Sequence, residues 1–256
     1  ILDNEIDYMQ ELGVEIKLNT PVKNLSELFN QGYKVIFLGT GAAESVKLGV
    51  PGEDTPGVIQ ALDFLKQSAS GSRMGLGDRV VVIGGGNAAV DAARAARRMG
   101  VKEVTIVYRR SRAEMPAYPE EVAEMENEGV KIQFLAAPVR INTKDSTITG
   151  IKCIRMELGE ADASGRRHPA PVKGSEFDIE CNNIIAAIGQ SVNKTALPKE
   201  LAFTGWGTVV VDQVTLETNI DGVFAGGDVV SGPSDVINSV AAGKEAAVSI
   251  DRYLRG

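Results

Sequence analysis

Apolar and polar positions follow two periods along this chain, and the two periods predict alternating helices and strands. Apolar residues spaced three or four apart predict helices, whereas short continuous apolar runs bounded by turn residues predict buried strands. The predicted helices cover residues 6–12, 26–32, 61–69, 87–99, 119–129 and 235–254. The predicted strands outside the middle of the chain cover residues 14–18, 35–38, 79–83, 104–107, 131–135, 208–211 and 223–227. Because strand and helix alternate from residue 79 to 135, we expect a βαβαβ unit and an α/β fold.

The pattern shortens between residues 139 and 185. The segments "VRIN", "ITGIKCIRMEL" and "EFDIECNNIIAAIG" are typical of strands, and the polar segment 159–174 between the last two indicates a hairpin or loop. We therefore expect an antiparallel meander after the βαβαβ unit. Before that unit, the stretch 70–78, "SGSRMGLGD", is rich in Gly and Ser and indicates a linker, with a domain boundary near residue 71.

The strongest chemical signal is the stretch "VVVIGGGNAAVDAARAARRMG". A strand runs into a Gly84-x-Gly86-x-x-Ala89 turn and then a helix, which is the context that a dinucleotide fingerprint requires. Gly84 permits a tight turn, Gly86 lets the backbone approach a pyrophosphate, and Ala89 lets the helix pack closely on the sheet. The helix N-terminus offers N–H groups and a positive dipole end to phosphate. The predicted nucleotide-binding residues are Gly84, Gly85, Gly86, Asn87, Ala88 and Ala89. The alternative is a glycine-rich turn that only tightens a βα corner.

The stretch "YRRSR" at residues 108–112 indicates which nucleotide is bound. NAD-binding versions of the motif place an acidic residue about 20 positions after the glycines, where it accepts the ribose 2′-hydroxyl. Here that place holds Arg109 and Arg110, whose guanidinium groups suit a 2′-phosphate, so we predict NADP(H). The alternative is an exposed ion-pair cluster of Arg109, Arg110 and Arg112 with nearby carboxylates, namely Glu114, Glu120 and Glu121.

Composition narrows the classes of function. The chain has 256 residues, 43% of them hydrophobic, and a net charge of −7. It can form one large or two medium domains, and it is too acidic for a general nucleic-acid or anionic-membrane surface. Cys153 and Cys181 lack the spacing of metal ligands or a disulfide framework, so we expect small core side chains. No apolar run is long enough to span a membrane and no signal peptide opens the chain, which favours a cytoplasmic protein.

Four motifs together carry a resemblance to a known family. The stretches "IGGGNAAVDAARAARRMG", "VYRRSRAEMPAYPEE", "AAIGQ" and "GVFAGGDVVSGPSDVINSVAAGKEAA" resemble the small (beta) subunit of NADPH-dependent glutamate synthase and its relatives, pyridine nucleotide-disulphide oxidoreductase-like flavoproteins. The resemblance covers essentially the whole chain. It implies an oxidoreductase that passes hydride from NADPH to FAD, and electrons onward to iron-sulfur clusters or a partner subunit.

The resemblance also implies flavin contacts in "AGGDVV" and the helix that follows. Asp228 would accept a hydrogen bond from a ribityl hydroxyl, and Gly227 would allow close approach to the flavin diphosphate. The helix entered through Asp235 and Val236 would direct its N-terminus at the isoalloxazine. Taken without the family, the alternative is that "AGGD" is only a strand-ending turn.

Two further segments match the crossovers of the family. Thr40 and Gly41 of "GTGA" are similar to the crossover beside FAD, and Gly189 and Gln190 of "AIGQ" are similar to the return crossover near the nicotinamide. Taken alone, "GTGA" carries almost no information.

The chain also departs from the family pattern. The family begins with a cysteine-rich iron-sulfur domain and a G-x-G-x-x-G flavin fingerprint, and neither occurs in these residues. We therefore expect a fragment in which a Rossmann-type NADP-binding domain, residues 71–195, is inserted in the remnant of a split FAD-binding domain, residues 1–70 with 196–256. The expected partners are an iron-sulfur domain or a large catalytic subunit, and a homodimer is compatible with the pattern.

Because the cofactors would perform the chemistry, no side chain is assigned a catalytic role. The single histidine, His168, lies in the polar segment 159–174 and is not expected to be catalytic. Two alternatives stay open. One is a flavin-free NADP-binding module without turnover, and the other is a non-catalytic docking domain.

Overall fold

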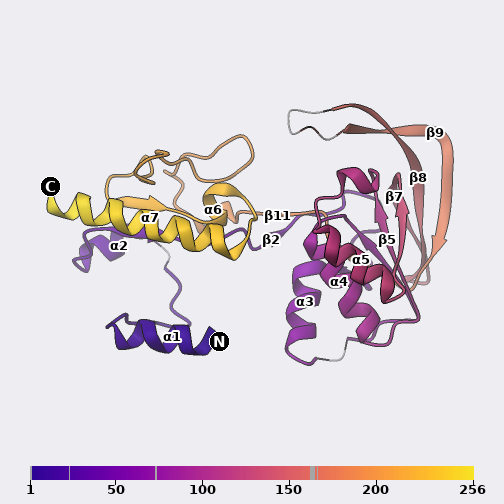
Figure 1. The fold of residues 1–256 in the computed structure, drawn as a ribbon, viewed down its shortest axis with the longest axis horizontal. Coiled ribbons are helices and arrows are strands. Elements are labelled where there is room, and N and C mark those ends of the chain that lie inside the picture. Colours follow the sequence, from indigo (N-terminus) through magenta and orange to yellow (C-terminus); the bar gives the residue numbers. More distant parts are fainter. Residues whose placement is uncertain (1, 23, 73, 162–164, 166) are drawn as a thin grey trace. The chain divides into compact units, whose positions relative to one another are not determined.

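A computed structural model of the chain describes residues 2–22, 24–72, 74–161, 165 and 167–256. The described chain divides into two compact units (Figure 1). The central unit comprises Thr40–Val192 with Ser231–Ser234, and the flanking unit comprises the described residues up to Gly39 with Asn193–Val230 and Asp235–Gly256. Each unit is described separately below.

A five-stranded parallel sheet forms the middle of the central unit, and it confirms the predicted α/β fold. In spatial order its strands are β3 (Val58–Gln60), β10 (Asn183–Ala186), β4 (Arg79–Ile83), β5 (Glu103–Tyr108) and β6 (Lys131–Phe134). Ile83 lies opposite both Val107 of β5 and Ala186 of β10. The carboxyl ends of these three strands therefore share one edge of the sheet.

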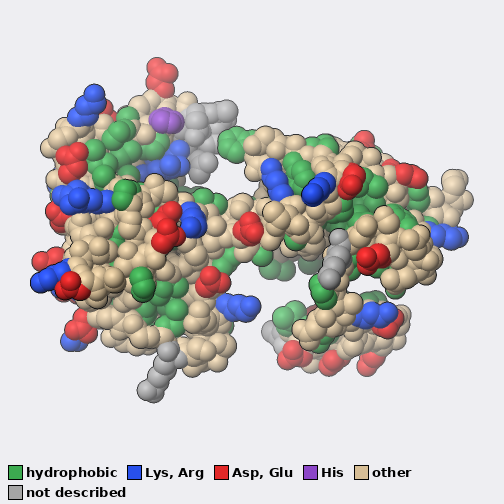
Figure 2. Space-filling view, turned by 180° about the vertical axis from the view of Figure 1, so that it is seen from behind, with side chains coloured by type: hydrophobic (Ala, Val, Ile, Leu, Met, Phe, Trp, Pro, Cys, Tyr) green, Lys and Arg blue, Asp and Glu red, His purple; other side chains and the backbone are tan. Residues whose placement is uncertain are grey.

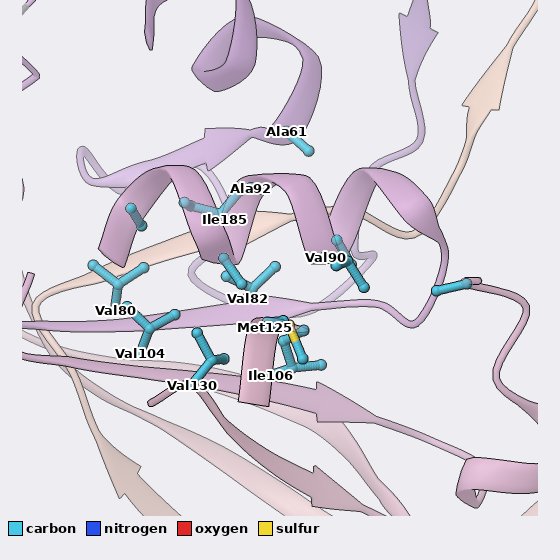
Figure 3. Packing of buried hydrophobic residues seen from close by; sticks show 14 of the residues in the cluster. Ala61, Val80, Val82, Val90, Ala92, Val104, Ile106, Met125, Val130 and Ile185 are labelled. Atoms are coloured by element: carbon cyan, nitrogen blue, oxygen red, sulfur yellow. The ribbon is translucent and has the colours of Figure 1, made fainter. Parts of the chain in front are cut away.

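The continuous apolar sequence of β4 reflects burial on both faces of the sheet. Val80 and Val82 point to one face, where they pack with residues of the helices (Figure 3). These helices are α3 (Ala61–Ala69), α4 (Asn87–Arg98) and α5 (Pro119–Asn127). Val81 and Ile83 point to the other face, so alternate residues of one strand serve two separate cores.

The second face of the parallel sheet is covered by an antiparallel sheet. Its strands, in order, are β7 (Ala136–Lys144), β8 (Thr147–Ala161) and β9 (Arg167–Glu180). Ile141, Ile151 and Cys153 from this sheet pack against Val81 and Ile83. The central unit is therefore a sandwich of helices, parallel sheet and antiparallel sheet.

The predicted meander is confirmed in part. The polar segment 159–174 belongs mostly to the arms of the β8–β9 hairpin, although residues 162–164 and 166 lie outside the described residues. Residues 183–186 were expected in the meander, but they form the parallel strand β10. The chain passes from the antiparallel to the parallel sheet at Asn182. Asn182 N donates to Arg79 O, and Asn182 Oδ1 accepts from Arg79 N.

The flanking unit is built on one pair of parallel strands, β1 (Ile36–Leu38) and β12 (Val223–Ala225). Its helices are α1 (Leu2–Glu11), α2 (Leu25–Asn30), α6 (Asp228–Ser231) and α7 (Val236–Arg255), with a 3₁₀ turn η2 (Lys194–Ala196). No described helix of the chain combines the length and apolarity that a membrane span requires.

Two strands predicted in the flanking unit are not formed. Residues 14–18 are exposed and pair with no described strand, so their backbone lacks the ladder that a strand needs. Residues 208–211 bury Val209 and Val211 but make only one isolated bridge, between Phe203 and Val209.

The compact units also divide at a different point from the predicted boundary near residue 71. Residues 40–70 belong to the central unit because β3 extends its parallel sheet and α3 packs in its core. The chain enters and leaves the central unit beside a short antiparallel pair, β2 (Glu44–Ser45) with β11 (Gln190–Ser191).

Candidate nucleotide-binding site

The glycine turn lies at the carboxyl edge of the parallel sheet, between the ends of β5 and β10. Gly84 N donates to Val107 O at 3.1 Å, and Ala187 N donates to Ile83 O at 2.8 Å. Ala117 N donates to Gly85 O at 3.2 Å, which brings the loop after β5 over the turn. Ligands of open parallel sheets bind at this edge.

The three glycines meet different requirements. Gly84 has φ +147°, and a Cβ there would lie 2.2 Å from Ala187 O. A Cβ on Gly85 would lie 2.4 Å from the Tyr108 ring, a packing role that sequence reasoning did not assign. A Cβ on Gly86 would meet nothing within 4 Å. The first two glycines therefore serve close packing, and the third leaves space in front of the turn.

That space faces the N-terminus of α4. Gly86 is the N-cap residue, and no side chain caps the helix. The first N–H groups of an α-helix have no partner inside the helix, so Asn87 and Ala88 present donors where the turn leaves room. Ala89 is completely buried and lets the helix pack on the sheet. A helix N-terminus of this kind can bind an anionic group such as a pyrophosphate. In addition, Asn87 Oδ1 accepts a hydrogen bond from Tyr118 N at 3.0 Å, which holds the neighbouring loop in place.

The arginines after β5 separate into different environments. Arg109 is exposed, and among the described residues its side chain makes no hydrogen bond or ion pair. Arg110 is only 8% exposed, and its Nε donates to the backbone O of Arg167 at 2.8 Å. Arg112 pairs with Glu126 and stacks 5.5 Å from the centre of the Phe134 ring. Arg112 therefore forms the kind of surface ion pair that the alternative interpretation expected, but with a different carboxylate.

Glu114, which the sequence suggested only as a carboxylate of an exposed ion-pair cluster, is instead buried and organises this loop. Glu114, in the 3₁₀ turn η1 (Arg112–Glu114), is 7% exposed and accepts from Ser111 Oγ at 2.5 Å in a capping box. Its second oxygen accepts from Arg167 Nε at 2.6 Å, and its backbone O accepts from Tyr108 Oη at 2.6 Å. The Ser111 hydroxyl and then the Arg167 guanidinium hold the pKa of Glu114 below its ordinary value.

The crossover residues lie in the central unit. Gly189 O accepts from Val46 N at 3.1 Å, and Gln190 lies opposite Ser45 in the β2–β11 pair. Thr40 and Gly41 precede β2, and Gly41 has φ +69°. Because Gly189 follows β10 at the carboxyl edge, the structure brings the predicted return crossover to the same edge as the glycine turn.

The remaining predicted residues lie in the flanking unit. Gly227 has φ +73° directly after β12, and Asp228 accepts from Ser239 Oγ at 3.4 Å. Asp235 is the N-cap residue of the 20-residue helix α7, and the following Val236 is 79% exposed. The hydrogen bond between Ser239 and Asp228 therefore connects the first turn of α7 to the segment that follows β12.

The cysteines and the histidine match their predicted environments. Cys153 and Cys181 are free and buried, and burial raises the pKa of each thiol to about 12. His168 lies exposed on β9. Among the described residues, no group of three or more His, Cys, Asp and Glu side chains is arranged to hold a metal ion.

On the face drawn in Figure 2, basic and acidic side chains are interspersed.

Known proteins match this chain over its whole length. The chain is 45% identical over 260 residues to the beta subunit of an NADP(+)-dependent formate dehydrogenase of Moorella thermoacetica, covering 100% of this chain and 37% of that protein. It is 35% identical over 273 residues to the glutamate synthase [NADPH] small chain of Azospirillum brasilense, covering 100% and 56%. The chain therefore spans only about half, or less, of the length of these relatives.

The fold is also found among solved structures. FprA of Mycobacterium tuberculosis, solved in complex with NADPH, superposes with a TM-score of 0.71 at 22% identity, covering 90% of this chain and 65% of that one. The family described as pyridine nucleotide-disulphide oxidoreductase matches residues 3–243. The chain thus belongs to the pyridine nucleotide-disulphide oxidoreductase family.

Proposed function

We propose that the chain is the nucleotide-binding part of an NADPH-dependent flavin oxidoreductase of the glutamate synthase small-subunit type. The observation that carries the proposal is the shared edge of the sheet, where the uncapped N-terminus of α4 follows β4 and the exposed Arg109 follows the neighbouring strand β5. A phosphate-binding turn and a cation at the end of the next strand suit the pyrophosphate and the 2′-phosphate of one nucleotide.

The residues of the central unit would each have a separate task. Gly86, Asn87 and Ala88 bind the pyrophosphate through backbone N–H groups and the helix dipole. Arg109 contacts the 2′-phosphate, while Arg110 shapes the loop that carries Arg109. Gly189 and Gln190, at the same edge, border the position of the nicotinamide.

The flanking unit would hold part of FAD. Gly227 and Asp228 suit the diphosphate and a ribityl hydroxyl, and Asp235 and Val236 open the helix that would face the flavin ring. Thr40 and Gly41, which belong to the central unit, would line the crossover beside FAD. When bound, FAD supplies the chemistry of accepting a hydride and releasing electrons singly. We further propose an iron-sulfur domain or a large catalytic subunit as electron-accepting partner, since the relatives above are named as subunits or chains of larger enzymes.

Nucleotide titration of variants tests the proposal. In the protein with whatever segments flank these residues, Arg109→Ala should weaken NADPH binding at least tenfold, because a charged hydrogen bond to phosphate is lost. NADH binding should stay within about twofold, since NADH carries no 2′-phosphate. Arg112→Ala is the matched control, because the Arg112 side chain is paired with Glu126. This variant should keep the preference for NADPH over NADH. Equal loss of both nucleotides in Arg109→Ala would contradict the 2′-phosphate assignment.

The flavin part is tested independently by the visible spectrum of the purified protein. A flavin band at about 450 nm that bleaches on addition of NADPH supports the oxidoreductase. A colourless protein that still prefers NADPH supports the flavin-free module instead.

A further inference from the structure

The loop that follows β5 carries a negative charge next to the proposed 2′-phosphate site. Glu114 is buried, and its capping hydrogen bonds come from Ser111, which is neutral. An ionised carboxylate in the same short loop as Arg109 and Arg110 repels a phosphate unless another cation compensates it. Its pKa lies below the ordinary value, so the charge is present at neutral pH.

The compensating cation comes from a distant part of the chain. Arg167, at the start of β9, donates from Nε to Glu114 Oε1 at 2.6 Å. Its side chain is 48% exposed, so one side of the guanidinium faces the carboxylate and the group also reaches solvent. The backbone O of the same residue accepts from Arg110 Nε at 2.8 Å. Arg167 thus contacts both the acidic and the basic member of the loop.

We propose that Arg167 is a positioning residue that sets the preference for a 2′-phosphorylated nucleotide, by neutralising Glu114 and fixing Arg110. The β8–β9 hairpin then takes part in cofactor choice through this one residue, although it lies outside the βαβαβ unit. This inference rests on the proposed function, because it requires a 2′-phosphate to be bound beside Arg109.

The proposal predicts a charge-specific effect, which a purely structural role would not produce. The probes are adenosine 2′,5′-bisphosphate and AMP, which differ by the 2′-phosphate and require no flavin. In the full protein, Arg167→Met should weaken binding of the bisphosphate about tenfold and leave AMP within about twofold, because an uncompensated carboxylate opposes only the added phosphate. Arg167→Lys retains the charge and should recover most of the affinity.

Removal of the carboxylate provides the decisive comparison. Glu114→Gln alone should bind the bisphosphate at least as tightly as the parent protein. The double variant Arg167→Met with Glu114→Gln should return to within about threefold of the parent, since no unpaired charge remains near the phosphate. Arg155→Met is the matched control, because Arg155 lies in the same antiparallel sheet with its guanidinium over the Phe177 ring, and among the described residues it forms no ion pair with Glu114.

The outcomes separate the inference from the function on which it rests. If the parent protein binds the bisphosphate no better than AMP, the proposed NADP function fails. If the parent prefers the bisphosphate and Arg167→Met keeps that preference, only the role of Arg167 is overturned. The same conclusion follows if Arg167→Met weakens both probes equally and Glu114→Gln does not restore them, because that pattern indicates loss of structure. If Arg167→Met does not fold, binding of the bisphosphate to Arg167→Lys and to Glu114→Gln is measured instead. Affinity close to that of the parent in Arg167→Lys, and at least as high as that of the parent in Glu114→Gln, supports the role of Arg167; a clear loss in Glu114→Gln overturns it.

Discussion

A side chain on Gly84 would place its Cβ 2.2 Å from the carbonyl oxygen of Ala187, at the point where β4 and β10 end together. Backbone atoms on both sides cannot yield easily, and φ +147° is unfavourable for an L-residue. We expect Gly84→Ala to lower the free energy of unfolding by about 3 kcal/mol or more. Urea unfolding followed by circular dichroism measures this, and a loss below about 1 kcal/mol would contradict the close contact.

Gly86→Ala should behave differently, although it lies only two residues away. The φ of Gly86 is −90°, and an added Cβ meets no atom within 4 Å. The free energy of unfolding should therefore stay within about 0.5 kcal/mol of that of the parent. The methyl group projects into the space proposed for the pyrophosphate, so affinity for NADPH and NADH should fall together. Calorimetric titration with both nucleotides checks this. Unchanged affinity for both would show that the pyrophosphate does not approach Gly86.

Arg110 and Arg109 should differ in their effect on stability. Arg110 is buried and donates to the Arg167 carbonyl, so Arg110→Met leaves an acceptor without this donor and should cost about 1–3 kcal/mol. Arg109 is exposed, and Arg109→Met should change stability by less than about 0.5 kcal/mol. Thermal unfolding of the two variants side by side is the measurement. Equal destabilisation would show that the two arginines share one environment.

Glu128 should stabilise the packing of α4 against α5 in a pH-dependent way. Hydrogen bonds from Arg98 and Arg94 hold the pKa of Glu128 below its ordinary value of 4.5. The unfolded chain therefore takes up this proton more readily, so the contribution is present above pH 4.5 and is lost as pH falls through the lowered folded value. Glu128→Gln should have a lower melting temperature than the parent at pH 7, and the two melting temperatures should converge once the pH falls below the lowered pKa of the folded state. A difference that does not change with pH would refute this account.

The two buried cysteines should resist alkylation. With a pKa of about 12, each thiol is almost entirely protonated at pH 8, and burial also blocks access. Iodoacetamide should label neither Cys153 nor Cys181 in the native protein within an hour, yet label both quickly in urea. Mass spectrometry of the quenched protein reads the result, and native labelling at the rate of a free cysteine would be inconsistent with the described core.

The elements that sequence reasoning predicted correctly are those in which local pattern and tertiary burial agree. In β4 a continuous Val run matches burial on both faces, and in α4 the alanines match a helix packed on a sheet. Residues 14–18 show why such agreement is necessary. Their strand-like sequence forms no strand, because no described segment pairs with them.

The candidate site was predictable to a similar extent. The glycine turn and Arg109 could be found from spacing, and the Ser111-x-x-Glu114 capping box was also readable in the sequence, although its significance was missed. Arg167 could not be found in this way. Its partner Glu114 lies 53 positions earlier, in a loop after β5, and the two residues meet only in the folded structure.

The two strands of the flanking unit's parallel pair are separated in sequence by residues 40–192, which make up nearly all of the central unit. As the chain leaves the ribosome, β1 must wait for β12 until residues 39–222 have been synthesised, roughly 10 to 40 s at ordinary rates of translation. The whole of 40–192 emerges during that interval, so the central unit can fold while Ile36 and Leu38 still lack their partner strand. The order of synthesis therefore allows the central unit to form before the parallel pair of the flanking unit.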